Sequence, residues 1–312
     1  MDELRIGLVG IGKIARDQHI PTIAALDGMT LAATASRNGS VPGVTAYKSL
    51  SELLEAEPDI PAVSLCTPPQ VRYADARAAL EAGRHVMLEK PPGQTLAEVH
   101  DLSALAESRG VTLFATWHSR HAAAVGATRD WLRGKTIRRL HVEWREDVRR
   151  WHLGQDWIWE PGGLGVFDSG INALSVLTEI YPRPVHLTKA DLTFPENRGT
   201  PIACRLAFHD PGGAEVTAEF DWREEGPQTW NIEIEIDGAS ALLSDGGGDF
   251  HVDGMRVAGG KAEALSGEYP ALYRDFLAQI RSGRSSVDLS PMVHVSDAMT
   301  LGRRIVTVPF EW

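Results

Sequence analysis

The sequence is poor in several features that would assign it to a specialised class of protein. Only two cysteines, Cys66 and Cys204, occur, and without CxxC spacing, which argues against a disulfide framework and favours a reducing compartment. Acidic residues outnumber basic ones and the net charge is -11, which argues against a nucleic-acid surface. No apolar run reaches the length of a membrane span. We therefore expect an ordinary soluble protein whose partners are neutral or polar small molecules, with neither nucleic acid nor membrane among them.

The length and the amino-terminal residues bound the size and location of the protein. A chain of 312 residues is long enough for two domains with a large core. Met1 to Glu3 lead into the first apolar run at once, so we expect no signal peptide and a cytoplasmic protein. The histidines show no HExxH or comparable spacing, so we expect no metal site and treat His118 and His152 as hydrogen-bond partners.

A glycine motif follows the first apolar run, Leu4 to Val9. The residues Gly10-Ile11-Gly12-Lys13-Ile14-Ala15 have the spacing G-x-G-x-x-A, and a helical pattern continues to Leu26. In a dinucleotide-binding fold the first glycine makes the turn, the second lets the backbone approach the pyrophosphate, and the alanine permits close helix packing. The preceding strand and the following helix favour a cofactor site over a simple tight turn.

The second apolar run, Leu31 to Ala35, ends in Ser36 and Arg37. An enzyme that uses NAD usually has an acidic residue here for the ribose hydroxyls. A hydroxyl and a guanidinium remove the repulsion of a 2′-phosphate and offer it hydrogen-bond donors. The pair therefore favours NADP as the cofactor, with NAD as the other possibility. The alternative is that Arg37 is an exposed loop arginine without a role in binding.

Strand-like and helical segments alternate as far as residue 118, which predicts a Rossmann domain with a doubly wound parallel sheet over residues 1–118. Residues that follow the apolar runs should lie at the carboxyl edge of the sheet, where ligands bind. They are Thr67, Pro68, Glu89, Lys90 and His118. Of the six lysines, Lys90 alone follows an uninterrupted apolar strand, and two prolines end that strand. It is either a solvated strand-end lysine or a catalytic group.

The pattern changes after His118 and predicts a second domain over residues 119–312. Residues 138–144, 216–222 and 232–237 alternate apolar and polar side chains with period two, which indicates a large, mainly antiparallel open sheet with one covered face. The other face is a candidate surface for a homo-oligomer. The segment from Leu289 has a helical pattern through Arg304, and the residues alone leave open whether it packs back on the first domain.

Between these strands lies a passage rich in tryptophan and glycine, residues 149–165, which runs into a predicted helix over residues 166–174. Its tryptophans serve either in a core or as flat surfaces for the C–H faces of a sugar. On the helix, Asp168 and Asn172 are four residues apart and therefore share one face. They either grip a polyol or are a helix cap with an incidental amide.

The glycine motif, Glu89-Lys90-Pro91 and Gly162-Gly163 followed by Asp168-Ser169-Gly170-Ile171-Asn172 together resemble the glucose-fructose oxidoreductase, inositol dehydrogenase and MocA family across nearly the whole chain. The runs 11–19, 114–120 and 146–152 are similar to its bacterial branch of aldose 1-dehydrogenases that act on L-arabinose and D-galactose. The resemblance implies oxidation of the C1 hydroxyl of such a sugar to the aldonolactone with NAD(P)⁺, by a dimeric or tetrameric enzyme. It also implies that the carboxyl-terminal helix packs back on the first domain.

The resemblance also implies roles for individual residues. Lys90 corresponds to the lysine of the family's EKP motif and Asp168 to the aspartate of its substrate-domain helix. Asn172 stands where the family commonly has histidine; because an amide cannot serve as a base, the proton must leave through Lys90 and Asp168. The sugar contacts implied are His118, Glu146, Trp151, His152, Asn172 and Trp230. The cofactor contacts expected are Gly10, Gly12, Lys13, Ile14, Ser36, Arg37, Thr67, Pro68, Glu89 and Lys90. Oxidation of glucose or inositol, or a dinucleotide-binding sensor without turnover, are the alternatives.

Overall fold

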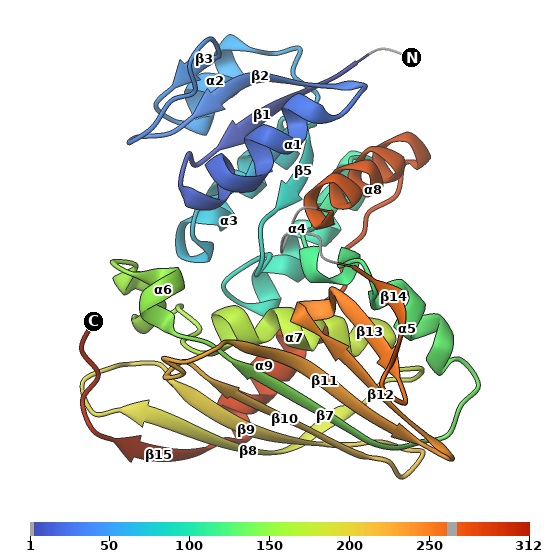
Figure 1. Cartoon of the computed structure of the whole chain (residues 1–312). Coiled ribbons are helices and arrows are strands. Elements are labelled where there is room, and N and C mark those ends of the chain that lie inside the picture. The colour runs from blue at the N-terminus through green and yellow to red at the C-terminus, as the bar shows by residue number, and fades with distance from the viewer. Residues whose placement is uncertain (1–2, 261–266) are drawn as a thin grey trace. The chain divides into compact units, whose positions relative to one another are not determined.

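The computed structural model describes residues 3–260 and 267–312. Within this part the chain divides into two compact units (Figure 1). Unit 1 contains residues 3–117 and 269–288, and unit 2 contains residues 118–260, 267–268 and 289–312. The division predicted from the sequence lies one residue from the first crossing, but the return of residues 269–288 to unit 1 was not predicted.

Unit 1 is built on a six-stranded sheet in the order β3-β2-β1-β4-β5-β6, in which every pairing is parallel. Its strands are β1 (Leu4–Val9), β2 (Met29–Ala35), β3 (Thr45–Tyr47), β4 (Ala62–Leu65), β5 (His85–Leu88) and β6 (Leu113–Ala115). The strand order reverses between β1 and β4, and ligands of such sheets bind at this switch point, beyond the carboxyl ends of the strands. The predicted Rossmann architecture is confirmed.

Helices connect the strands of unit 1, as the alternating pattern predicted. They are α1 (Ile20–Ala25), α2 (Leu50–Ala56), α3 (Pro69–Glu81) and α4 (Leu96–Arg109). Thr95 caps α4 by accepting a hydrogen bond from the backbone N–H of Glu98 at 3.3 Å. The helix expected directly after the glycine motif differs from the prediction, because it opens with a π-helical turn, η1 (Ala15–His19), before α1.

A helix from the carboxyl-terminal third completes unit 1. Helix α8 (Glu268–Ser282) places Tyr269, Tyr273 and Phe276 in one apolar cluster with residues of β1, β5 and β6. These three side chains are fully buried. Their spacing of four and three residues puts them on one face of the helix. Core contacts that are remote in the sequence therefore hold α8 to the parallel sheet.

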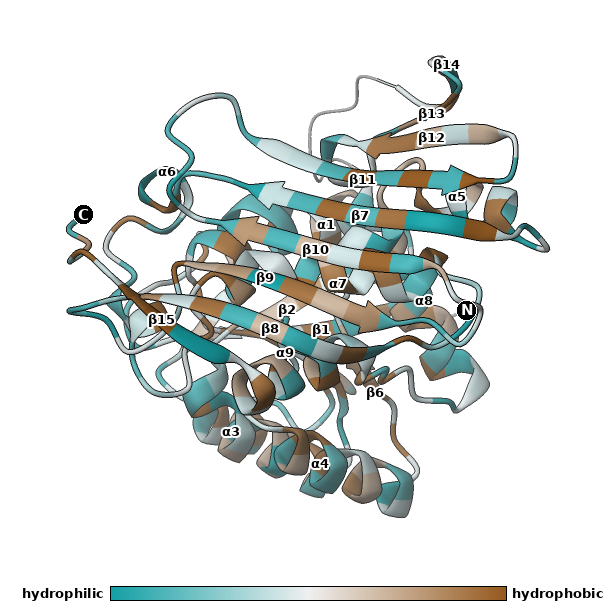
Figure 2. Cartoon of the chain, turned by 90° about the horizontal axis from the view of Figure 1, so that it is seen from below, coloured by the Kyte–Doolittle hydropathy of each residue, from teal (hydrophilic) through white to brown (hydrophobic). Residues whose placement is uncertain are grey.

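Unit 2 is built on a nine-stranded sheet in the order β14-β13-β12-β11-β7-β10-β9-β8-β15. The strands are β7 (Ile137–Arg145), β8 (His186–Pro195), β9 (Ala203–His209), β10 (Glu215–Asp221), β11 (Thr229–Ile236), β12 (Ala239–Ser244), β13 (Asp249–Val252), β14 (Met255–Gly259) and β15 (Arg303–Thr307). Within this sheet, only the pairs β7·β10 and β8·β15 are parallel among the described strands. Hydrophilic and hydrophobic residues alternate along β7, β10 and β11 (Figure 2), so the predicted, mainly antiparallel sheet with one covered face is confirmed.

Helices pack on the apolar face of this sheet. Helix α7 (Phe167–Ile180) contacts β7 and lies between α5 (Val125–Leu132) and α9 (Ser290–Leu301). A Cβ atom on Gly170 would lie 2.4 Å from the Phe220 ring, so only glycine lets α7 approach β10 this closely. The helix that carries Asp168 is therefore fixed tightly to the sheet.

The carboxyl-terminal segment differs from the prediction. Helix α9 contacts α7 and β8, so it belongs to unit 2. Its predicted extent through Arg304 is wrong, because α9 ends at Leu301 and Arg303 begins β15. The edge of β8 supplies hydrogen-bond partners that a local helical pattern cannot reveal. The helix that returns to unit 1 is α8.

Candidate active site

The glycine motif forms a tight turn after β1. Gly10 has a φ of +86°, and a Cβ atom on it would lie 2.9 Å from Thr67, so both the conformation and the contact require glycine. A Cβ atom on Gly12 would meet nothing within 4 Å. The buried Thr67 hydroxyl has no hydrogen-bond partner among the described residues. Open space beside Gly12 and an unsatisfied hydroxyl at the end of β4 fit the diphosphate of a dinucleotide.

The residues after β2 form a pocket of about 420 Å³. The Ser36 hydroxyl accepts a hydrogen bond from the backbone N–H of Ile11 at 3.4 Å, so the pocket adjoins the glycine motif. Two of its side chains are basic, and none of its described lining residues is acidic. The pocket is lined by Ser36, Arg37, Asn38, Gly39, Ser40, Ala46, Tyr47 and Lys48. Lys48 is a cation here that the sequence analysis did not assign.

Two other predicted cofactor residues, Lys13 and Ile14, lie within the glycine motif itself. The Lys13 ammonium forms an exposed ion pair with Asp17, one helical turn onward. Ile14 is partly buried and packs against the apolar cluster that α8 forms with the sheet. Pro68 precedes α3 as its N-cap residue. These three residues therefore lie at the amino ends of the segments that follow β1 and β4, which is the edge expected for a cofactor.

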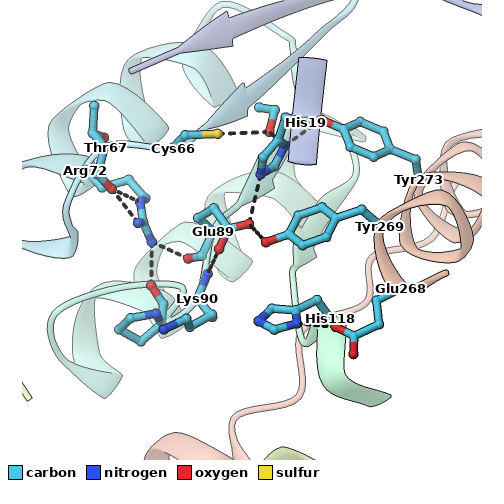
Figure 3. A network of polar contacts seen from close by, with 12 residues as sticks. His19, Cys66, Thr67, Arg72, Glu89, Lys90, His118, Glu268, Tyr269 and Tyr273 are labelled. Atoms are coloured by element: carbon cyan, nitrogen blue, oxygen red, sulfur yellow. Dashed lines mark hydrogen bonds and ion pairs between the residues drawn. The ribbon is translucent and has the colours of Figure 1, made fainter. Parts of the chain in front are cut away.

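Lys90 follows β5, as predicted, and hydrogen bonds hold the main chain around it (Figure 3). Its backbone N–H donates to the carboxylate of Glu89 at 2.9 Å. The guanidinium of Arg72, which is only 2 % exposed, donates to the carbonyl oxygens of Glu89 and Pro91 and to that of Thr67. Arg72 therefore joins the ends of β4 and β5, and the sequence analysis missed it.

Glu89 is buried, and its carboxylate accepts two further hydrogen bonds. The Tyr269 hydroxyl donates at 2.8 Å and His19 Nε2 lies at 2.9 Å, both at Oε1. On its other side, His19 Nδ1 lies 2.7 Å from the Tyr273 hydroxyl. Burial by itself lowers the pKa of His19, but Cys66, Tyr273 and Glu89 around the ring raise it well above its ordinary value. Burial also raises the pKa of Tyr273.

In unit 2, Glu146 lies just beyond β7 and is buried. The indole N–H of Trp222 donates to one carboxylate oxygen at 3.1 Å and that of Trp230 to the other at 3.0 Å. Trp222 also donates to the Ser169 hydroxyl on α7 at 2.8 Å. The structure thus joins two predicted sugar contacts, Glu146 and Trp230, by a direct hydrogen bond, and it adds Trp222 and Ser169, which were not predicted to have a role.

Asp168 lies in the first turn of α7 and is 4 % exposed. His152, from the short helix α6 (Val148–His152), places Nε2 at 3.7 Å from its carboxylate and its ring centroid at 5.2 Å from that of Trp222. Trp151 stacks obliquely on Trp230, with 5.9 Å between the ring centroids. The rings of α6, Glu146 and Asp168 therefore form one cluster of aromatic and polar groups.

The remaining predicted sugar contacts are placed differently. Asn172 lies one turn after Asp168 on α7 and is half-buried. His118 is the first residue of unit 2 and is buried, with Nδ1 at 2.6 Å from the carboxylate of Glu268. An imidazole beside a carboxylate is held in one orientation and one tautomer. No single signal in the sequence pointed to Glu268, which is 150 residues away along the chain.

Among the described residues, no group of histidine, cysteine and acidic side chains could hold a metal ion. Cys66 and Cys204 are free cysteines. No described helix combines the length and apolar character needed to cross a membrane.

Comparisons with known proteins identify the family to which the chain belongs. Residues 4–116 match the model of the GFO/IDH/MocA oxidoreductase family with an NAD-binding Rossmann fold. The chain is 41 % identical to a galactose 1-dehydrogenase from Pseudomonas fluorescens, over 99 % of both chains. A solved D-galactose-1-dehydrogenase from Rhizobium etli is 52 % identical, with a TM-score of 0.95 over 100 % of this chain and 99 % of that one. A 3-ketoreductase from Actinomadura kijaniata, in complex with TDP-benzene and NADP, shares the fold at 19 % identity, with a TM-score of 0.81 over 98 % of this chain and 100 % of that one.

Proposed function

Because the chain belongs to the GFO/IDH/MocA oxidoreductase family with an NAD-binding Rossmann fold, we propose that it is an NAD(P)-dependent sugar dehydrogenase that oxidises the C1 hydroxyl of D-galactose and L-arabinose to the aldonolactones. The observation that carries this proposal is the cluster of Asp168, His152, Glu146 and two indoles in unit 2, in a chain that matches two galactose 1-dehydrogenases over its full length. Flat rings beside buried carboxylates suit a sugar, which presents C–H faces and hydroxyls together.

The proposed reaction removes a hydride from C1 and a proton from O1, so that C1 and O1 become the carbonyl group of the lactone. A bound nicotinamide supplies the hydride acceptor, so the chain's own residues must take the proton. Lys90 is our proposed general base, and Asp168 is the second catalytic residue that we propose. His152, at 3.7 Å from Asp168, orients that carboxylate. The Asn172 amide cannot accept a proton as a base, so it orients the sugar instead.

A panel of sugars tests the substrate. D-Galactose and L-arabinose in its pyranose form share the configuration at C1 to C4 and differ only in the hydroxymethyl group at C5. A site that hydrogen-bonds the axial 4-hydroxyl accepts both and disfavours D-glucose. Reduced cofactor should therefore form fastest with D-galactose and L-arabinose, and more slowly with D-glucose and inositol. The highest turnover on glucose or inositol would contradict the proposed substrate, and no turnover with any sugar would favour a sensor.

The pocket after β2 supports NADP as the preferred cofactor. Arg37 and Lys48 both line it, and two cations with the Ser36 hydroxyl suit a 2′-phosphate. Arg37→Gln should raise the KM for NADP⁺ and leave the KM for NAD⁺ nearly unchanged, because only NADP⁺ carries the phosphate. Arg133→Gln, an exposed arginine of unit 2, is the matched control. A wild-type protein that prefers NAD⁺ would overturn this assignment.

We also propose that the protein acts in the cytoplasm, which free cysteines suit. The predicted dimer or tetramer stays a prediction, and size-exclusion chromatography with light scattering tests it.

A further inference from the structure

The carboxylate of Glu89 is the centre of a hydrogen-bond network inside unit 1. It receives the Tyr269 hydroxyl, His19 Nε2 and the backbone N–H of Lys90, at 2.8 Å, 2.9 Å and 2.9 Å. Burial of a carboxylate without such partners is unfavourable. Three donors on a side chain that is 4 % exposed therefore fix its position.

The third of these donors is what links the network to the candidate base. The carboxylate of Glu89 bonds the N–H of the residue that follows it, while Arg72 bonds the carbonyl oxygens of Glu89 and Pro91. The backbone around Lys90 is therefore held through the N–H group of Lys90 and through the carbonyl groups of Glu89 and Pro91. A shift of the Glu89 carboxylate would move the N–H of Lys90 with it.

Two of the groups that hold Glu89 come from elements remote from β5. His19 ends η1, and Tyr269 lies in the first turn of α8. Figure 3 shows both side chains directed at the same carboxylate, with Tyr273 behind the imidazole. The rings of His19 and Tyr269 also meet edge to face, with 5.0 Å between their centroids. Packing thus restricts the rotamers of both donors.

We infer that His19 and Tyr269 are positioning residues for Lys90, acting through the carboxylate of Glu89. The inference rests on the proposed function, in which Lys90 accepts the O1 proton. A base must lie within hydrogen-bond reach of the proton it removes, and small displacements of a reacting group slow turnover steeply. Neither residue needs to touch the sugar or the cofactor for this role.

Tyr269→Phe tests the inference, because it removes one hydroxyl and keeps the ring that packs in the core. We expect kcat to fall about tenfold, less than the ~10²-fold that a displacement of 1 Å can cause, while the KM values for sugar and NADP⁺ stay within about twofold. Tyr73→Phe is the matched control. It removes a hydroxyl that donates to Asp101 at 2.7 Å on the surface of unit 1, and it should leave kcat unchanged.

Two readouts separate a positioning role from a structural one. The pH at which turnover reaches half of its maximum should shift in Tyr269→Phe and not in Tyr73→Phe, whereas a loss of stability alone would lower the thermal midpoint and leave the pH profile in place. The rate at which Lys90 is acetylated, followed by mass spectrometry, should rise in Tyr269→Phe. This second readout needs no turnover, so it tests the network even if the wild type oxidises no sugar.

An unchanged kcat, pH profile and Lys90 acetylation rate in folded Tyr269→Phe would overturn the inference. A wild type without activity on any sugar would instead overturn the proposed function. Glu89→Gln provides a second route, because the amide keeps the shape of the side chain but offers one acceptor oxygen where the carboxylate offers two. It should reproduce the fall in kcat, and wild-type kcat in this variant would also count against the role of the network.

Discussion

Two buried carboxylates, one in each unit, are held in different ways. Glu89 and Glu146 are 4 % and 5 % exposed, and each accepts hydrogen bonds from two aromatic side chains. The donors to Glu89 are an imidazole and a phenol, whereas both donors to Glu146 are indoles. Imidazole and phenol can exchange their protons, but an indole only donates. Protonation of a donor can therefore alter the network around Glu89, while the indole donors to Glu146 do not titrate.

The difference matches a division of work between the units. A fixed carboxylate among flat rings presents a constant surface, which suits recognition of a sugar. A carboxylate whose partners titrate lies beside Lys90, where the proposed reaction moves a proton. The comparison predicts that changes near Glu89 act on turnover, and changes near Glu146 act on sugar binding and stability.

The largest effect is expected at Lys90. Lys90→Ala should lower kcat by about 10²- to 10⁴-fold, because a general base is removed, while the KM for sugar changes little. Steady-state kinetics measures both effects, and Lys189→Ala, at an exposed lysine on β8, is the control. Turnover near the wild-type rate would remove Lys90 from the mechanism and erase the contrast between the units.

A smaller effect is expected at Glu146. Glu146→Gln should destabilise the protein by about 1–3 kcal/mol, because one buried indole N–H then faces an amide donor instead of an acceptor. The KM for sugar should rise while kcat stays nearly constant. Chemical denaturation and steady-state kinetics measure the two quantities.

Glu143→Gln is the matched control on β7. Glu143 forms a partly exposed ion pair with Arg145 at 2.9 Å, and such pairs contribute about 1 kcal/mol or less. If Glu146→Gln lowered kcat without raising the KM for sugar, its role would resemble that of Glu89, and the division of work would be wrong.

The smallest effect is a dependence of stability on pH. The pKa of His19 is raised in the folded protein by its partners Cys66, Tyr273 and Glu89, so its protonated form is favoured by folding. This contribution is complete below the unfolded pKa of about 6.5 and is lost as the pH rises through the folded pKa. The thermal midpoint of His19→Gln should therefore fall furthest below that of the wild type near pH 6, and the gap should narrow toward pH 9.

The same comparison made with Glu146→Gln should give a gap that stays constant between pH 6 and pH 9, because indoles do not titrate there. Differential scanning calorimetry at several pH values measures both gaps. A constant gap for His19→Gln would show that the imidazole acts as a neutral donor only, and would remove the electrostatic part of the contrast.

Local patterns predicted most of the elements that carry the candidate site. The alternation of residues 216–222 gave β10 to within one residue and would also have predicted that Trp222 points inward with Phe220, since they are two apart. The π-helical turn at Ala15–His19 and the strand at Arg303–Thr307 were missed. Both depend on neighbours in space, and the second exists because the edge of β8 is there to pair with.

The sequence by itself determined the parallel and antiparallel sheets, the glycine turn and the places of Lys90 and Asp168, because periodicity, glycine conformation and strand ends are properties of short segments. The tertiary structure alone decided which distant side chains meet. Tyr269 reaches Glu89 from 180 residues away and Glu268 reaches His118 from 150 residues away. Nothing within a short segment encodes such pairings, because they arise when α8 packs its apolar face into the core of unit 1 and its first turn brings these polar groups along.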